Sequence, residues 1–323
     1  MNNFKKIGLT ALAGSLVATS VYAGEMSVNG NASVHMNNRA GTDGGKNISM
    51  GNQLTFTGGG ELDNGLNVAL SFVLDHGDNV ASGFDSHSIT ISSDTLGSIT
   101  VAGDGTGNAQ SALDTTAAGD IWDQSFTYGT NDGSSYTAPL ASDAANSKSI
   151  NYTLPEIMDG LAVAASYSGS TATAQSTTAV GLTYTGIEGL TAYYGAGESA
   201  VTNHAGTGSK ADITSMGASY AMGSFTAAYS INDVDADTNG TDEEQTSWKL
   251  SYTVTDDLSI TYGEEAHETS GQTTDEEFSS LSVSYTTGGM TLTAQQIDAE
   301  GLGNQTGQAG EAARWKLGAS FAF

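Results

Sequence analysis

The chain has 323 residues, and its 36 acids against 9 bases give a formal net charge of −27. Nucleic-acid binding needs a basic face, so this acidity argues against it. The absence of cysteine excludes disulfide frameworks, thiolate zinc sites and cysteine nucleophiles. With 38% hydrophobic residues the chain is also too polar for a bundle of membrane-spanning helices. An elongated secreted β protein and a membrane β-barrel both remain compatible with the composition.

Residues 1–23 have the features of an export signal. Lys5 and Lys6 precede a short apolar stretch, and small residues lead up to Ala23 as in a signal-peptidase site. The alternative, a membrane helix at the start of the chain, is disfavoured because the apolar stretch is short. Cleavage after Ala23 would leave residues 24–323 as one domain. The loss of two lysines from the 9 bases would bring its charge to about −29.

The rest of the chain alternates apolar with small or polar residues at a period of two, which indicates β-strands. In 66–75, for example, Leu66, Val68, Leu70 and Phe72 interleave with Asn67, Ala69 and Ser71, and the same pattern recurs in 225–231, 248–254 and 314–323. A soluble sandwich would bury the apolar face, whereas a membrane barrel turns it toward lipid around a wet lumen.

The spacing of short turns distinguishes these two architectures. Turn-forming residues recur at 63–65, 94–97, 155–160, 187–189, 222–223, 256–257 and 287–289. Most intervals hold about 30–37 residues, enough for two strands of ~10 residues and a longer loop. Seven turns divide the domain into eight strand pairs. The sequence therefore predicts an all-β, sixteen-stranded antiparallel transmembrane barrel with short periplasmic turns and longer external loops.

One interval, between Gly97 and Pro155, is almost twice as long as the others. Strands are expected at 98–104 and 147–154, which leaves 105–146 as an outsized third loop. A loop of this length usually has a function of its own. We expect it to fold into the lumen and narrow the channel.

Two stretches, Leu54–Phe72 and Ile89–Asp104, together with the terminal Phe323, resemble the Gram-negative general porins, most closely their α-proteobacterial branch. The resemblance covers the domain at the level of pattern. It implies a multi-pass homotrimer embedded in outer-membrane lipid, through which ions and small hydrophilic solutes diffuse passively. It also implies that the last strand carries a signal read by the barrel-assembly machinery. The residues matching that signal are Trp315, Phe321 and Phe323. Alternatively, the final phenylalanine is only an interface anchor.

The side chains facing the pore follow from parity, because neighbours of lipid-facing residues face inward. This places four bases on the pore wall: His35, Lys249, Arg314 and Lys316. The third loop supplies acids that, in the porins it resembles, oppose such bases across the constriction: Asp114, Asp120, Asp123, Asp132 and Asp143. Because bases are so few, we expect mild cation selectivity. The alternative is that most acids lie on outer loops, where salt screens them.

One acidic segment, Asp235, Asp237 and Asn239, reads as the front of a calcium loop. Its twelfth position is Thr246, where a helical calcium loop has a bidentate Glu. The segment is therefore either a loosely binding Ca²⁺ site or a solvated loop, and no other cofactor is expected.

The sequence gives little sign of an enzyme. Nucleophile-elbow, zinc-protease and P-loop motifs are missing, and the five histidines are scattered. Two further alternatives stay open: a substrate-specific outer-membrane channel and an acidic secreted β-rich adhesin. A β-solenoid adhesin would need a short internal repeat, which the sequence lacks.

Overall fold

The computed structural model describes residues 26–38, 46–75, 86–104, 109–110, 116–123, 148–170, 175–199, 210–236, 242–304, 306–307 and 310–323. Within these ranges the chain forms sixteen antiparallel strands that close into one barrel. The predicted fold class is therefore confirmed. In the described part of the chain no helix is both long and apolar enough to cross a membrane.

The strands are β1 (Met26–Asn38), β2 (Lys46–Glu61), β3 (Asn67–Asp75), β4 (Ser86–Ser93), β5 (Gly97–Asp104), β6 (Ser149–Thr153), β7 (Leu161–Ser168), β8 (Thr177–Tyr184), β9 (Leu190–Ser199), β10 (Ala211–Met222), β11 (Phe225–Ala236), β12 (Glu243–Thr255), β13 (Leu258–Thr269), β14 (Glu276–Thr287), β15 (Met290–Glu300) and β16 (Ala312–Ala322). The described parts of the connections contain two short 3-10 turns, η2 (Ile121–Asp123) and η4 (Leu302–Asn304). All seven predicted turns join consecutive strands.

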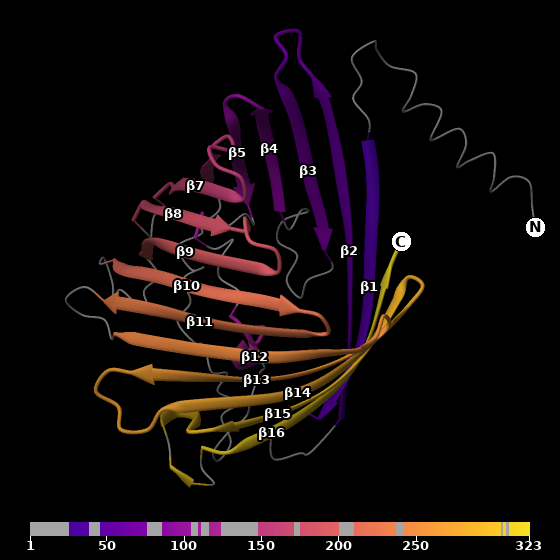
Figure 1. Cartoon of the computed structure of the whole chain (residues 1–323), viewed down its shortest axis with the longest axis vertical. Helices are drawn as coiled ribbons and strands as arrows, with labels where there is room; N and C mark the ends of the chain where they lie inside the picture. Colours follow the sequence, from indigo (N-terminus) through magenta and orange to yellow (C-terminus); the bar gives the residue numbers. More distant parts are fainter. Residues whose placement is uncertain are drawn as a thin grey trace, which may run out of the picture.

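Consecutive strands pair around the whole barrel, and β1 pairs with β16 to close it. Figure 1 shows the indigo β1 beside the yellow end of β16. At this seam Gly30 and Phe323 exchange two backbone hydrogen bonds, of 2.8 and 2.9 Å. The wall therefore has no free sheet edge along this pairing, as a membrane barrel requires.

The period-two pattern separates two faces of the wall. On β12, Trp248 and Leu250 are exposed on the outer face, whereas Ser247 faces inward and is 1% exposed. The same alternation places Tyr229 outside and Ser230 inside on β11. Apolar side chains outside and small polar ones inside are the arrangement of a lipid-facing barrel.

Among the described residues, buried apolar side chains form two clusters inside the barrel. The larger cluster, which we call the inner cluster, consists of Ile121, Trp122, Phe278, Ile297, Ala299 and Leu302. The smaller one consists of Ala211, Ile213 and Val234 on β10 and β11. The inner cluster joins two connections to the wall and thus leads directly to the candidate site.

Candidate functional site: the third loop on the inner wall

The third connection runs from the end of β5 at Asp104 to the start of β6 at Ser149, close to the predicted 105–146. Its described parts, 109–110 and 116–123, lie against the inner face of the wall. Ala109 N donates to Ser166 Oγ of β7 at 2.7 Å, and Gln110 Nε2 donates to Ser215 Oγ of β10 at 3.2 Å. The expected inward course is thus seen for these residues.

Two further wall serines continue this row of anchors. Ala117 N donates to Ser230 Oγ of β11 at 2.9 Å, and Ala118 N donates to Ser247 Oγ of β12 at 2.8 Å. A loop lying on a wall has backbone N–H groups with no ladder partner, and each needs an acceptor. Inward-facing serines on separate strands provide them, so the wall chemistry fixes the path of the loop.

The strongest anchor is Glu265 on β13, which is 2% exposed. Its Oε1 accepts a hydrogen bond from Thr116 Oγ1, and its Oε2 accepts one from Trp122 N at 2.8 Å. Ser247 Oγ also donates to Oε1, at 3.3 Å. A buried carboxylate is costly unless donors surround it, and here the donors include Thr116 and Trp122 of the third loop.

Apolar contacts hold the same part of the loop. Ile121 and Trp122 of η2 pack with Phe278 of β14 and Ile297 of β15 in the inner cluster. In Figure 1 the magenta η2 lies within the curve of the strands, and it contacts β13 and β14. The inner cluster removes these four side chains from the lumen water, which favours this position of the loop.

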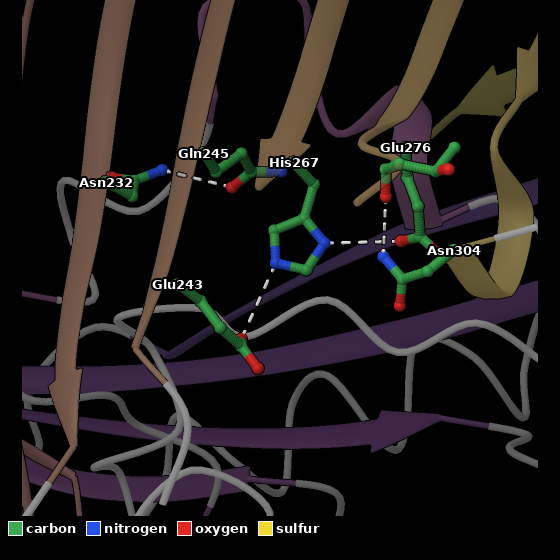
Figure 2. Close-up of polar contacts among 7 residues, drawn as sticks. Asn232, Glu243, Gln245, His267, Glu276 and Asn304 are labelled. Carbon is green, nitrogen blue, oxygen red and sulfur yellow. Dashed lines mark hydrogen bonds and ion pairs between the residues drawn. The ribbon is translucent and has the colours of Figure 1, made fainter. Parts of the chain in front are cut away.

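A second polar group lies on the neighbouring wall, near the external ends of β11 to β14 (Figure 2). His267 Nδ1 is 3.2 Å from Glu276 Oε2, and His267 Nε2 is 3.5 Å from Glu243 Oε2. Beside it, Asn232 Nδ2 donates to Gln245 Oε1 at 3.3 Å. His267 and Glu276 are 3% and 1% exposed, so four strands are joined by a buried polar network.

The predicted wall bases fall into two places. His35, Arg314 and Lys316 share the seam: Lys316 is opposite Asn37, and a Cβ on Gly318 would lie 2.8 Å from His35 Nδ1. Lys249 lies elsewhere, on β12 opposite Gly263, which faces the third loop. All four are on inward positions of their strands, and their part in the pore stays a prediction.

Two of the five predicted loop acids, Asp120 and Asp123, belong to the described residues. Asp114, Asp132 and Asp143 lie outside the described residues, and Asp123 is the last residue of η2. Asp120 Oδ1 accepts a hydrogen bond from Thr116 N at 2.9 Å, while Asp120 N donates to Thr116 Oγ1 at 2.7 Å. Asp120 therefore closes a turn of the loop. A transverse field between loop acids and wall bases stays a prediction.

The remaining predicted residues are partly described. Trp315 lies on β16, and Phe321 and Phe323 are 42% and 73% exposed. Their part in assembly stays a prediction. Asp235 is exposed on β11, whereas the export segment 1–23 and the residues Asp237 and Asn239 lie outside the described ranges. Among the residues that can be described, no three His, Asp or Glu side chains are placed to hold a metal ion.

Acids also gather on the outer face of the wall, near the external ends of β9 to β15. Parity turns them outward, and like charges stand directly opposite one another across strands. The opposed pairs are Glu198 with Asp212, Asp212 with Asp235, Asp233 with Glu244, Glu244 with Glu268, and Glu277 with Glu300. On the described strands, these eight acids therefore face away from the lumen.

Sequence reasoning missed Glu243, Glu265, Glu276 and His267 as wall groups. Parity alone would have turned each of them inward, since Gly263, Ser247 and Phe278 on the same strands face the lumen. Their partners, however, lie far away in the sequence or in loops without periodicity. The sequence could therefore predict that these four side chains face inward, but not which groups they contact.

Comparison with known proteins agrees with this geometry. A family model described as Gram-negative porin matches residues 8–323. No curated protein matches the chain in sequence. Among solved structures, a loop-deletion mutant of the outer membrane protein OmpT of Vibrio cholerae is similar, with 17% identity, a TM-score of 0.67 and coverage of 93% of this chain and 100% of that one.

Two other solved structures are similar to the same extent. An anion-selective porin from Comamonas acidovorans shares 16% identity with a TM-score of 0.64, covering 93% of this chain and 99% of its own. A mutant of Rh. blastica porin shares 15% identity with a TM-score of 0.63, covering 93% and 100%. At these identities the likeness concerns the fold.

Proposed function

Because the chain belongs to the Gram-negative porin family, we propose that it forms a water-filled outer-membrane channel for passive diffusion of ions and small hydrophilic solutes, with a mild preference for cations. The observation that carries the proposal is the inward third loop, fixed to serines of β7, β10, β11 and β12 and to Glu265 of β13. A loop held on the lumen face narrows the passage and so sets the size of what passes.

The preference for cations rests on charge. Opposed acids flank the external mouth at the ends of β9 to β15, where they raise the local concentration of cations. The bases at the seam oppose this effect, so the preference is mild. The Comamonas relative is an anion-selective porin of the same fold, so fold alone does not set the sign.

The assembly follows the relatives. One structure of V. cholerae OmpT is its trimer form, with a TM-score of 0.64 to this chain. We infer a homotrimer, exported through cleavage after Ala23 and inserted by the barrel-assembly machinery. We assign it no catalysis and no firmly held cofactor. A substrate-specific channel is the nearest alternative, whereas a secreted adhesin has no support from the closed barrel or the family match.

The test is single-channel recording in planar bilayers with detergent-purified mature protein under a KCl gradient. We expect large current steps that close in three equal sublevels at high voltage, and a reversal potential of cationic sign. A reversal potential of anionic sign would overturn the ion preference alone. Folded, heat-modifiable barrels that carry no current would overturn the diffusion channel itself.

A further inference from the structure

A second connection also turns into the lumen. β15 ends at Glu300 and β16 begins at Ala312, and between them Gly301 has a φ of 69°. A Cβ on Gly301 would collide with the Asp275 carbonyl, so the turn requires glycine. The next residue, Leu302, is 0% exposed, and its N–H donates to the Gly310 carbonyl at 3.0 Å.

Glu276 of β14 clamps this connection to the wall. Gly303 N donates to Glu276 Oε1 at 2.6 Å, and Asn304 Nδ2 donates to the Thr274 carbonyl at 3.0 Å. The other oxygen of Glu276 contacts His267, which in turn contacts Glu243 (Figure 2). Glu276 therefore does for residues 302–304 what Glu265 does for the third loop: a buried carboxylate accepts backbone N–H groups of an inward segment.

The two inward segments meet in the inner cluster. Leu302 packs there with Ile121 and Trp122 of the third loop and with Phe278 and Ile297 of the wall. A leucine in a polar lumen is stable only where apolar neighbours cover it. Leu302 and the third loop belong to the same cluster around Phe278 and Ile297, so loss of either segment would uncover apolar surface of that cluster.

We propose that the constriction is a two-segment device, in which residues 301–304 act as a positioning element that holds η2 of the third loop against β13 and β14. Leu302 and Glu276 are its positioning residues. The proposal rests on the channel function for its consequence, since the position of the third loop limits the passage. Its structural part can be measured without any current.

Trp122 offers a direct probe, because the chain has three tryptophans and the other two lie on the outer face of the wall. In a Trp248→Phe, Trp315→Phe background, emission comes from Trp122 alone. Trp122 is 6% exposed, so iodide should quench it poorly. We expect Leu302→Ser to remove this protection and bring its quenching constant close to that of an exposed indole.

The matched control is Ile213→Ser in the same background. Ile213 is as buried as Leu302, at 1% exposed, and belongs to the smaller cluster on β10 and β11. It should leave Trp122 protected. Heat-modifiable migration in gels shows that each variant has a folded barrel. Two less disruptive variants, Glu276→Ala and Glu276→Gln, test the hydrogen bond between Glu276 and Gly303 N. We expect iodide to quench Trp122 more in Glu276→Ala than in Glu276→Gln, because glutamine keeps an acceptor for Gly303 N–H.

Unchanged quenching of Trp122 in folded Leu302→Ser, or an equal rise in folded Ile213→Ser, would overturn the two-segment device. If Leu302→Ser does not fold, the Glu276 pair decides by the same readout. If iodide quenches Trp122 strongly in Leu302→Ser but the unaltered barrel carries no current, the channel function is wrong and the two-segment device stands. If the barrel conducts normally and the quenching of Trp122 does not change in Leu302→Ser, the two-segment device is wrong and the channel function stands.

Discussion

Ala118 of the third loop lies directly over Gly263 of β13, so that a Cβ on Gly263 would be 2.8 Å from the Ala118 methyl carbon. Because Gly263 has no side chain, the wall leaves room for Ala118 at this point, beside the two hydrogen-bond acceptors Ser247 and Glu265. Any side chain at this position must push the loop away from the wall and toward the centre of the passage.

We therefore expect Gly263→Val to lower the open-channel current. Because the new Cβ would also lie 2.9 Å from the Trp248 carbonyl of β12, heat-modifiable migration in gels must show that the variant barrel is folded. The current is measured in planar bilayers. Gly58→Val on β2 is the control, since a Cβ there meets nothing within 4 Å. Equal currents in the two variants would show that the loop does not limit the passage.

Removal of the Glu265 carboxylate should loosen the third loop. Glu265→Ala leaves Thr116 Oγ1 and Trp122 N without their acceptor, at a cost of about 1–3 kcal/mol for each buried donor left unsatisfied. We expect greater open-channel noise in Glu265→Ala than in Glu265→Gln, which retains one acceptor oxygen. Noise that is the same in both variants would mean that the loop is held by its other contacts.

The sign of ion selectivity should respond to the seam bases. The double variant Arg314→Gln, Lys316→Gln removes two positive charges from the lumen and should shift the reversal potential further toward cations. Lys46→Gln is the control, because Lys46 is exposed and turned outward on β2. If Lys46→Gln shifts the reversal potential as much as the double variant does, the selectivity arises from the total charge of the protein and not from the bases that line the lumen.

The outer acids should repel one another. Glu244 stands opposite both Asp233 and Glu268, and directly opposed like charges destabilise a sheet by roughly 0.2–1 kcal/mol. Glu244→Gln should therefore raise the temperature at which the barrel loses its heat-modifiable form. The gain should shrink in high salt, which screens exposed charges.

A nearby acid provides the contrast. Glu264 accepts hydrogen bonds from Trp248 Nε1 at 3.2 Å and from Tyr262 Oη at 2.6 Å. Glu264→Gln should lower the same temperature or leave it unchanged. A rise in Glu264→Gln as large as that in Glu244→Gln would mean that net charge, and not the opposed pairs, decides stability.

The last residue separates assembly from stability. Phe323 makes its two seam hydrogen bonds through the backbone, and its ring lies over Gly30, where a Cβ would collide with it. If the ring is a signal, Phe323→Ala should reduce the amount of barrel inserted in cells while the inserted fraction melts close to the normal temperature. A normal yield with a lowered melting temperature would make the ring an anchor only.

The regular part of this protein was predictable and the irregular part was not. Period-two alternation determines which way each strand residue points, so the sixteen strands and the inward bases followed from local pattern. In the run Asp275-Glu276-Glu277, composition predicts only a solvated acidic stretch. Glu276 is nevertheless buried, because parity turns it inward and residues 303–304, which have no periodicity, lie over it. The net charge is a poor guide to the charge of the lumen for a related reason, because it does not tell which acids face inward and which face outward.

The order of the strands also bears on how the barrel forms. Among the described strands every pairing but one joins neighbours in sequence, so the sheet can grow hairpin by hairpin with little loss of loop entropy. The exception brings Asn31 beside Ala322, and until then β1 and β16 are bare edges able to pair with other chains. By contact order, the pairing of β1 with β16 is the slow, non-local step of folding. A protein that binds the free edge of β1 or β16 before this step would protect the chain from aggregation.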